Sequence, residues 1–259
     1  MNDYHKYLPA AIEIARTAGE VLLAHFRTDY LEMHTKSNNC DLVTSADQAS
    51  ERIIKDTIHA LFPEHGILSE ESGEENFDRE WRWVVDPLDG TTNFSQGLPP
   101  FSVSIALEHN GESVVGVVYA PYLGELFHAV KGCGAFLNGK PIHCSQKSQL
   151  SHAVLATGVP YDKNENPDNN LSEIMRVVPD VRAIRRLGSA AIDLAYTAAG
   201  FYDAYWELNL KRWDVAAGVL IAREAGAKLT SIRSDRNFSL LASSPLLYDS
   251  MLRLLTVAD

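Results

Sequence analysis

The spacing of apolar residues changes along this chain, and this change narrows the folds that it can adopt. From Leu8 to Phe26 the apolar residues recur every three or four positions, which predicts a helix with one buried face. At 101–108 they alternate with small or polar residues, the pattern of a half-buried strand. After residue 150, strand patterns alternate with helical ones. The sequence therefore predicts a layered protein with helices and sheets, of the α/β or α+β class.

Local signals place further elements. A second helix is expected to begin near Thr44, because its hydroxyl and the Asp47 carboxylate resemble a capping box, and to end before Pro63. The turn after residue 108 opens an antiparallel meander that runs to about residue 145. Later patterns predict strands at 153–158, 181–186, 202–207 and 238–243, and helices at 188–199, at 214–225 with Gly226 as its stop, and near the end of the sequence.

Composition excludes several classes of protein. With 46% hydrophobic residues, 259 residues can bury a substantial core, as one domain or as two sub-domains that meet near residue 150. No apolar stretch reaches the ~20 residues of a membrane span, and the first residues lack a signal-peptide pattern, so a cytoplasmic location without membrane contact is expected. The formal charge of −11 argues against direct nucleic-acid binding, and the three cysteines lack CxxC spacing.

The segment WVVDPLDGTTNF, residues 83–94, carries the strongest chemical signal. A predicted strand ends at Asp86, Pro87 stiffens the following turn, and Gly90 allows a backbone conformation that other residues avoid. If the Asp86 and Asp89 carboxylates lie a few ångströms apart, they repel by roughly 4 kcal/mol unless a proton or cation lies between them. A divalent cation would remove this repulsion. The alternative is a solvated turn, which an isolated aspartate pair favours.

Three other acidic positions could join such a site. Glu70 follows a short apolar run, Asp214 lies at the mouth of a predicted helix, and Asp47 lies in the first turn of another. Surface charge, an N-cap and a capping partner are sufficient explanations for them when each is taken alone. A metal site is the better interpretation only if these acids converge.

Five motifs favour convergence, because they occur in the order and approximate spacing of the inositol monophosphatase family: DLVTSAD, SEES, DPLDGTTNF, GSAAID and WDVAAG. The resemblance extends from Lys36 to the last helix, and TTN after the glycine is similar to the bacterial-type inositol-1-monophosphatase branch. It implies a layered αβαβα sandwich of the inositol monophosphatase and fructose-1,6-bisphosphatase type. This would be a single domain over 1–259, with possible sub-domains 1–150, which binds metal, and 151–259, and a homodimer.

The resemblance also implies an activity. The chain would be a lithium-sensitive phosphatase that hydrolyses inositol monophosphate to inositol and phosphate with two or three Mg²⁺ per site, Mn²⁺ being a possible substitute. Hard oxygen ligands suit these ions independently of the family. The implied metal ligands are Glu70, Asp86, the Leu88 carbonyl, Asp89 and Asp214.

The family's catalytic roles map onto matching positions. Glu70 and the Thr91 hydroxyl would position the attacking water, and Asp47 would accept a hydrogen bond from Thr91. The metal held by Asp214 would stabilise the leaving oxygen. Without the family, 188–190 would be only a helix start and Glu207 a charge at a strand end. The implied substrate-binding residues are Asp89, Gly90, Thr91, Gly188, Ser189, Ala190, Glu207 and Asp214.

Two positions depart from the family pattern. Arg212 stands where bacterial relatives commonly carry proline, and its guanidinium is predicted to reach a second anionic group of the substrate, the alternative being a solvated loop cation. Phe201 stands where relatives often carry a basic residue, which could affect a subunit contact.

Other functions stay open within this resemblance. Related proteins hydrolyse fructose 1,6-bisphosphate, adenosine 3',5'-bisphosphate, NADP or histidinol phosphate at the same type of metal centre. A different class is a metal-binding regulatory protein that contacts the transcription or ribosome-assembly machinery. The complete set of acidic residues favours catalysis over this class, although it does not exclude a protein partner.

Overall fold

A computed structural model describes residues 3–28, 33–35, 42–76 and 78–256, so Lys36, Cys40 and Asp41 lie outside the described residues. Its helices are α1 (Leu8–His25), α2 (Ser45–Leu61), α3 (Thr91–Ser95), α4 (Leu171–Val177), α5 (Ala190–Ala198), α6 (Arg212–Glu224) and α7 (Tyr248–Thr256), with short 3₁₀ helices at Tyr4–Tyr7, Leu150–His152 and Val178–Asp180. None of the described helices combines the length and apolar character of a membrane span.

The strands form three sheets. Strands β1 (Met33–Thr35) and β2 (Leu42–Thr44) form a small hairpin. The eight-stranded sheet has the order β10-β9-β8-β7-β6-β5-β3-β4 and contains β3 (Gly66–Ser69), β4 (Gly73–Glu75), β5 (Trp81–Asp89), β6 (Ser102–His109), β7 (Glu112–Ala120), β8 (Glu125–Val130), β9 (Ala135–Leu137) and β10 (Lys140–Ile142). The five-stranded sheet has the order β12-β11-β13-β15-β14 and contains β11 (Val154–Thr157), β12 (Ala183–Arg185), β13 (Ala204–Leu210), β14 (Lys228–Ser231) and β15 (Phe238–Ser243).

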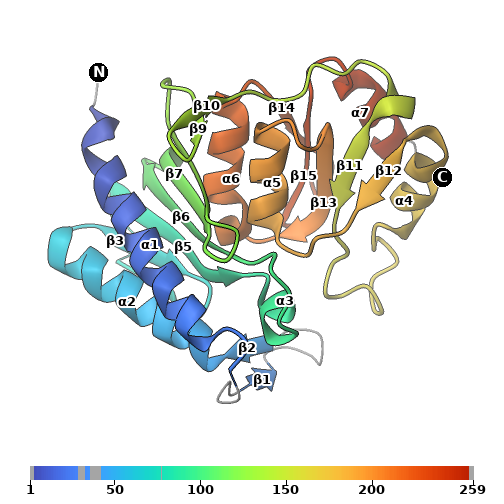
Figure 1. Cartoon of the computed structure of the whole chain (residues 1–259). Coiled ribbons are helices and arrows are strands. Elements are labelled where there is room, and N and C mark those ends of the chain that lie inside the picture. Colours follow the sequence, from blue (N-terminus) through green and yellow to red (C-terminus); the bar gives the residue numbers. More distant parts are fainter. Residues whose placement is uncertain (1–2, 29–32, 36–41, 77, 257–259) are drawn as a thin grey trace.

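Helices and sheets alternate in five layers (Figure 1). Helices α1 and α2 cover the outer face of the eight-stranded sheet, α5 and α6 lie between the two large sheets, and α4 and α7 cover the far face of the five-stranded sheet. The predicted αβαβα sandwich is therefore confirmed. Its division into sub-domains near residue 150 stays a prediction, because α5 and α6 pack on both sheets.

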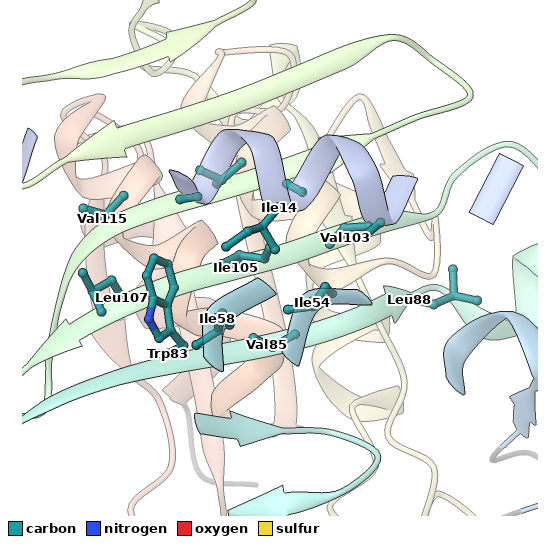
Figure 2. Packing of buried hydrophobic residues seen from close by; sticks show 14 of the residues in the cluster. Ile14, Ile54, Ile58, Trp83, Val85, Leu88, Val103, Ile105, Leu107 and Val115 are labelled. Carbon is teal, nitrogen blue, oxygen red and sulfur yellow. The ribbon is translucent and has the colours of Figure 1, made fainter. Parts of the chain in front are cut away.

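Apolar side chains on the two outer helices form the core that supports the later site. Figure 2 shows Ile14 of α1 and Ile54 and Ile58 of α2 directed toward the apolar face of β5 and β6. The Leu88 side chain belongs to the same core at the end of β5. The end of β5 is thus anchored by apolar packing, which keeps the following polar turn in place.

The prediction that 101–108 is half buried is wrong. Strand β6 is buried along both faces, because α5 and α6 cover the side that Ser102, Ser104 and Ala106 present. Ser102 Oγ lies 3.5 Å from Ser189 Oγ, and Ser104 Oγ donates to the Trp213 carbonyl at 3.4 Å. Small side chains permit this close approach of the helices.

The predicted helix boundaries hold at the first two long helices. Thr44 caps α2, and its backbone N–H donates to Asp47 Oδ2 at 2.8 Å, which confirms the capping box. Gly226, with φ +89°, follows the end of α6 as predicted. Helix α6 begins at Arg212 rather than Asp214, and β5 continues through Pro87 with an irregular register between Asp86 and Asp89. The short α4 and β14 were not predicted.

Candidate active site

Two parallel strands bring the first acids of the site together. Strands β3 and β5 pair in parallel with Ser69 opposite Val85, and the Glu70 N–H donates to the Val85 carbonyl at 3.2 Å. Glu70, the residue after β3, therefore lies beside Asp86 near the carboxyl ends of both strands. Such an edge is the usual place for a ligand site in α/β sheets.

The turn after Asp86 is fixed by hydrogen bonds. The Leu88 N–H donates to Asp86 Oδ1 at 3.0 Å, and Ser50 of α2 donates to the Pro87 carbonyl at 2.8 Å. Gly90 has φ +91°, and a Cβ there would lie 2.9 Å from the Pro100 carbonyl oxygen, so this position requires glycine. Asp89 is thus presented three residues beyond Asp86 on a rigid segment.

Helix α6 supplies a fourth carboxylate. Asp214 is its third residue, and Asp214 Oδ2 accepts a hydrogen bond from the Lys211 N–H at 2.6 Å. The capping function suggested by the sequence is therefore present, although Asp214 is not the N-cap residue. The same carboxylate also faces the other acids, because Glu70 is a main cause of its raised pKa after burial itself.

Burial and mutual repulsion disfavour the ionised forms of these acids. Asp86 is only 1% exposed, and burial together with the Glu70, Asp89 and Asp214 carboxylates raises its pKa well above the usual range. Burial raises the pKa of Asp89 to about 6, although hydrogen bonds from Ser189 and Ala191 act in the opposite direction. Ionising all four acids together is therefore unfavourable unless positive charge is supplied.

This donor set fits a hard divalent cation. Carboxylate oxygens and a backbone carbonyl suit Mg²⁺ or Mn²⁺, whereas zinc and copper sites usually include nitrogen or sulfur ligands. The side chains are not arranged in a finished coordination geometry, since no three Asp, Glu, His or Cys side chains in the described part of the chain form a ready-made metal group.

Thr91 links this cluster to α2. Its hydroxyl lies 3.3 Å from Asp47 Oδ1 and 3.1 Å from the Leu88 carbonyl oxygen, and it can donate to either. The other carboxylate oxygen of Asp47 accepts the N–H and hydroxyl of Thr44. Asp47 therefore caps a helix and contacts Thr91 at the same time, so the two interpretations of this residue are compatible.

A pocket of about 350 Å³ opens beside the acids. Seven residues implied by the family resemblance line it: Glu70, Asp89, Gly188, Ser189, Ala190, Glu207 and Asp214. Five other implied residues do not line it: Asp47, Asp86, Leu88, Gly90 and Thr91. Asp86, Asp47 and Thr91 are buried, and the substrate contact that the family resemblance implies for Gly90 and Thr91 stays a prediction.

The start of α5 is tied directly to the acid cluster. Ser189 Oγ and the Ala191 N–H donate to Asp89 Oδ2 at 2.5 and 2.8 Å. Asn93 Nδ2 donates to the carbonyls of Pro100 and Leu187, each at 2.7 Å. Residues 188–190 are therefore more than a helix start, because they set the orientation of Asp89.

Glu207 lines the same pocket. Tyr205, which is fully buried, donates its hydroxyl to Glu207 Oε2 at 2.7 Å. Burial raises the pKa of Glu207 to about 7, while Tyr205 and Arg186 act to lower it. A Cβ at position 158 would overlap the Glu207 carboxylate, so Gly158 leaves the space that this side chain occupies.

Sequence reasoning did not assign a role to Arg186 and Lys211, which line the pocket, or to Tyr205 and Gly158, which lie against Glu207. Arg186 and Lys211 are the cationic side chains among the described residues that line the pocket. Only Leu187 separates Arg186 from the GSAAID motif, and this closeness to the motif could have indicated that Arg186 lies near the site. Tyr205 and Glu207 lie two positions apart on β13 and so share a face of that strand, whereas the relation of Gly158 to Glu207 depends on the pairing of β11 with β13.

The prediction that Arg212 reaches a substrate anion is wrong. Arg212 does not line the pocket, and its Nε donates to Glu108 Oε1 of β6 at 2.6 Å. The alternative of a solvated loop cation is wrong as well. Phe201 is half exposed and packs edge-on against Tyr196, so its predicted part in a subunit contact stays a prediction.

Known proteins resemble this chain over almost its full length. Nus factor SuhB of Escherichia coli K12 is 41% identical over 254 residues, which cover 96% of this chain and 95% of the relative. An inositol-1-monophosphatase of Caulobacter vibrioides is 42% identical over 255 residues, covering 95% of this chain and all of the relative. This chain is therefore about equally similar to a relative named as a Nus factor and to one named as an inositol-1-monophosphatase.

Solved structures agree with the fold. An inositol monophosphatase from Anabaena superposes with a TM-score of 0.88 at 41% identity, covering 98% of this chain and 96% of the other. The extragenic suppressor protein SuhB from Bartonella henselae gives 0.89 at 39% identity, covering 96% and 97%. The model of the inositol monophosphatase family matches residues 3–255, and the chain therefore belongs to this family.

Proposed function

We propose that this chain is a Mg²⁺-dependent phosphomonoesterase that hydrolyses inositol monophosphates. The observation that carries the proposal is the convergence of Glu70, Asp86, Asp89 and Asp214 beside a pocket of about 350 Å³. Glu207, which lines the same pocket, can accept hydrogen bonds from substrate hydroxyls. Metal affinity and hydroxyl acceptance in one pocket suit the phosphate of a polyol.

The four acids and the Leu88 carbonyl would hold the cations. When bound, Mg²⁺ would offset phosphoryl charge and favour the deprotonated form of the attacking water. The chain contributes orientation: Asp47 and the Leu88 carbonyl restrict the Thr91 hydroxyl, which would leave the hydroxyl oxygen to accept from that water. The Ser189 and Ala191 hydrogen bonds hold Asp89 in one rotamer.

Thr91→Ala is expected to reduce kcat at least about tenfold with little change in KM, because the hydroxyl would orient the water rather than bind the substrate. Steady-state kinetics at saturating Mg²⁺ measures this. Thr92→Ala is the matched control, since its side chain is exposed one position along the same helix. A rise in KM without a loss of kcat would contradict the role given to Thr91.

Tyr205→Phe is expected to raise the KM for inositol 1-phosphate about three- to tenfold, because it removes a hydrogen bond of typically ~1 kcal/mol that orients Glu207. The KM for para-nitrophenyl phosphate, which lacks the polyol hydroxyls, should stay constant. Tyr202→Phe is the control, since Tyr202 is also buried but, among the described contacts, its hydroxyl does not donate to Glu207. Equal KM changes for both substrates would exclude this role of Tyr205.

Phosphate release from a panel of monoesters, compared by kcat/KM with Mg²⁺, tests the proposed substrate. The panel should include inositol 1-phosphate, fructose 1,6-bisphosphate, adenosine 3',5'-bisphosphate, NADP and histidinol phosphate. Arg186 and Lys211 could favour a second anionic group, whereas the Glu207 carboxylate would disfavour one. A preference for a bisphosphate would replace inositol monophosphate as the substrate and leave the metal mechanism intact.

A regulatory function is the second candidate. It is favoured by the similarity to Nus factor SuhB, which is as close as the similarity to inositol-1-monophosphatase. The acid cluster favours retained catalysis and is compatible with an additional protein partner. A homodimer, lithium sensitivity and a cytoplasmic location remain predictions from the sequence and the family.

A further inference from the structure

We propose that Arg212 is a positioning residue, whose ion pair with the buried Glu108 holds the first turn of α6, and with it Asp214, against the eight-stranded sheet. Asp214 matters here through the proposed metal site, so the inference rests on the proposed function. The contact itself is a property of the fold and can be measured without a metal.

Glu108 is shared between two arginines from different elements. It is fully buried on β6, where Arg82 of β5 donates to Oε2 from Nε at 3.1 Å and from Nη2 at 2.7 Å. Arg212 donates to the other oxygen, Oε1, from Nε at 2.6 Å. Each carboxylate oxygen thus has its own arginine, an arrangement that compensates the cost of burying the charge.

Arg212 also contacts both large sheets. Its Nη2 donates to the Gly111 carbonyl at 3.2 Å in the turn between β6 and β7. Its guanidinium carbon lies 5.4 Å from the ring centre of Phe238, at the start of β15. A planar guanidinium can make these directed contacts together, whereas a lysine ammonium cannot reproduce the same fork.

The position of Arg212 in α6 connects this network to the site. Arg212 is the first residue of the helix, and Asp214 follows two residues later. Between them, the Trp213 carbonyl accepts a hydrogen bond from Ser104 Oγ at 3.4 Å, a long and therefore weaker contact. The pair with Glu108 is consequently the strongest polar link between this turn and β6 among the described contacts.

Three variants separate positioning from general stability. Arg212→Ala removes the ion pair and leaves the helix start unsupported. Arg212→Pro also removes the ion pair, but proline at the first helical position fixes φ and supports the helix start, and the extended Lys211 is compatible with a following proline. Arg82→Ala removes the other arginine of Glu108 without altering α6.

Hydrogen exchange in peptides covering 212–218 is measured without metal, and Mg²⁺ binding is measured by calorimetry. In Arg212→Ala, exchange should accelerate and Mg²⁺ affinity should fall about three- to tenfold, less than the 10- to 100-fold typical when a direct partner of a metal ligand is lost. Arg82→Ala should lower the Tm while both quantities stay at wild-type values. Arg212→Pro should lose Mg²⁺ affinity to a similar extent as Arg212→Ala, because its ring supports the helix start but cannot hold it against the sheet.

Unchanged exchange in Arg212→Ala would overturn the inference, as would equal changes in Arg82→Ala and Arg212→Ala. Absence of Mg²⁺ binding in the wild type would instead contradict the proposed function. In that case faster exchange in Arg212→Ala but not in Arg82→Ala would still support the positioning of α6 by Arg212, and its absence would still refute it.

Discussion

Replacing Asp89 or Asp214 with asparagine is expected to lower kcat/KM at least about 100-fold. Mutating a residue that only hydrogen-bonds to a metal ligand already lowers metal affinity or activity roughly 10- to 100-fold, and these two aspartates are proposed to be ligands themselves. Asparagine keeps one carbonyl-type oxygen but removes the negative charge that would hold the cation. Steady-state phosphate release from inositol 1-phosphate, over a range of Mg²⁺ concentrations, measures the effect. Raising Mg²⁺ should not restore the wild-type rate.

The fold should survive both substitutions. An asparagine oxygen at position 214 can still accept from the Lys211 N–H, and one at position 89 can still accept from Ser189 and Ala191. Burial raises the pKa of both aspartates, which means that their ionised forms are disfavoured in the metal-free protein. Neutral replacements should therefore leave the Tm of the metal-free protein unchanged or raised.

Asp203→Asn provides a matched control for these variants. Asp203 is fully buried and accepts hydrogen bonds from Lys147 and the Val154 N–H, but it does not line the pocket. Its replacement should lower the Tm and leave kcat/KM unchanged. Wild-type kinetics in Asp89→Asn or Asp214→Asn would show that the residue has only its turn or capping role.

The sequence predicted those parts of the fold that depend on neighbouring residues. The spacing of apolar residues every three or four positions predicted α1, and the Thr44–Asp47 capping box predicted the start of α2. Both signals come from residues that lie within a few positions of one another in the sequence. The same reasoning failed for β6, whose serines looked solvent-facing but are buried under α5 and α6. Burial of both faces follows from the layer order, which local alternation does not contain.

The candidate site divides in the same way. Asp86 and Asp89 were detected because a proline lies between them and a glycine follows them within one short segment. The Glu108–Arg212 pair was missed because 104 positions separate the two residues, and Arg212 was consequently assigned to the substrate. Tyr205 looked like a core residue, and it is one, yet its hydroxyl also orients Glu207. Charge pairing over long sequence separations requires the assembled fold.

Removal of Mg²⁺ is expected to abolish phosphatase activity, and adding Mg²⁺ back should restore it. The physical reason is the buried group of acids around Asp86. Burial and three neighbouring carboxylates raise the pKa of Asp86, so the ionised forms of these acids are disfavoured without a cation. Bound Mg²⁺ would stabilise the ionised acids and supply the positive charge that the mechanism requires. The measurement is phosphate release after dialysis against EDTA, followed by titration with Mg²⁺. A protein that turns over at its full rate in excess EDTA would rule out the metal mechanism.

The choice of replacement ion tests the geometry of the same cluster. Mn²⁺ should support activity, because its hard-oxygen preference is similar to that of Mg²⁺. Ca²⁺ should bind but support at most a few per cent of the rate, since its oxygen distances of about 2.3–2.6 Å exceed the roughly 2.1 Å of Mg²⁺. Mg²⁺ should also raise the Tm of the wild type, because a ligand that binds only the folded protein stabilises it, and this rise should be lost in Asp214→Asn. An equal Tm rise in both proteins would place the bound Mg²⁺ away from Asp214, even if activity required the ion.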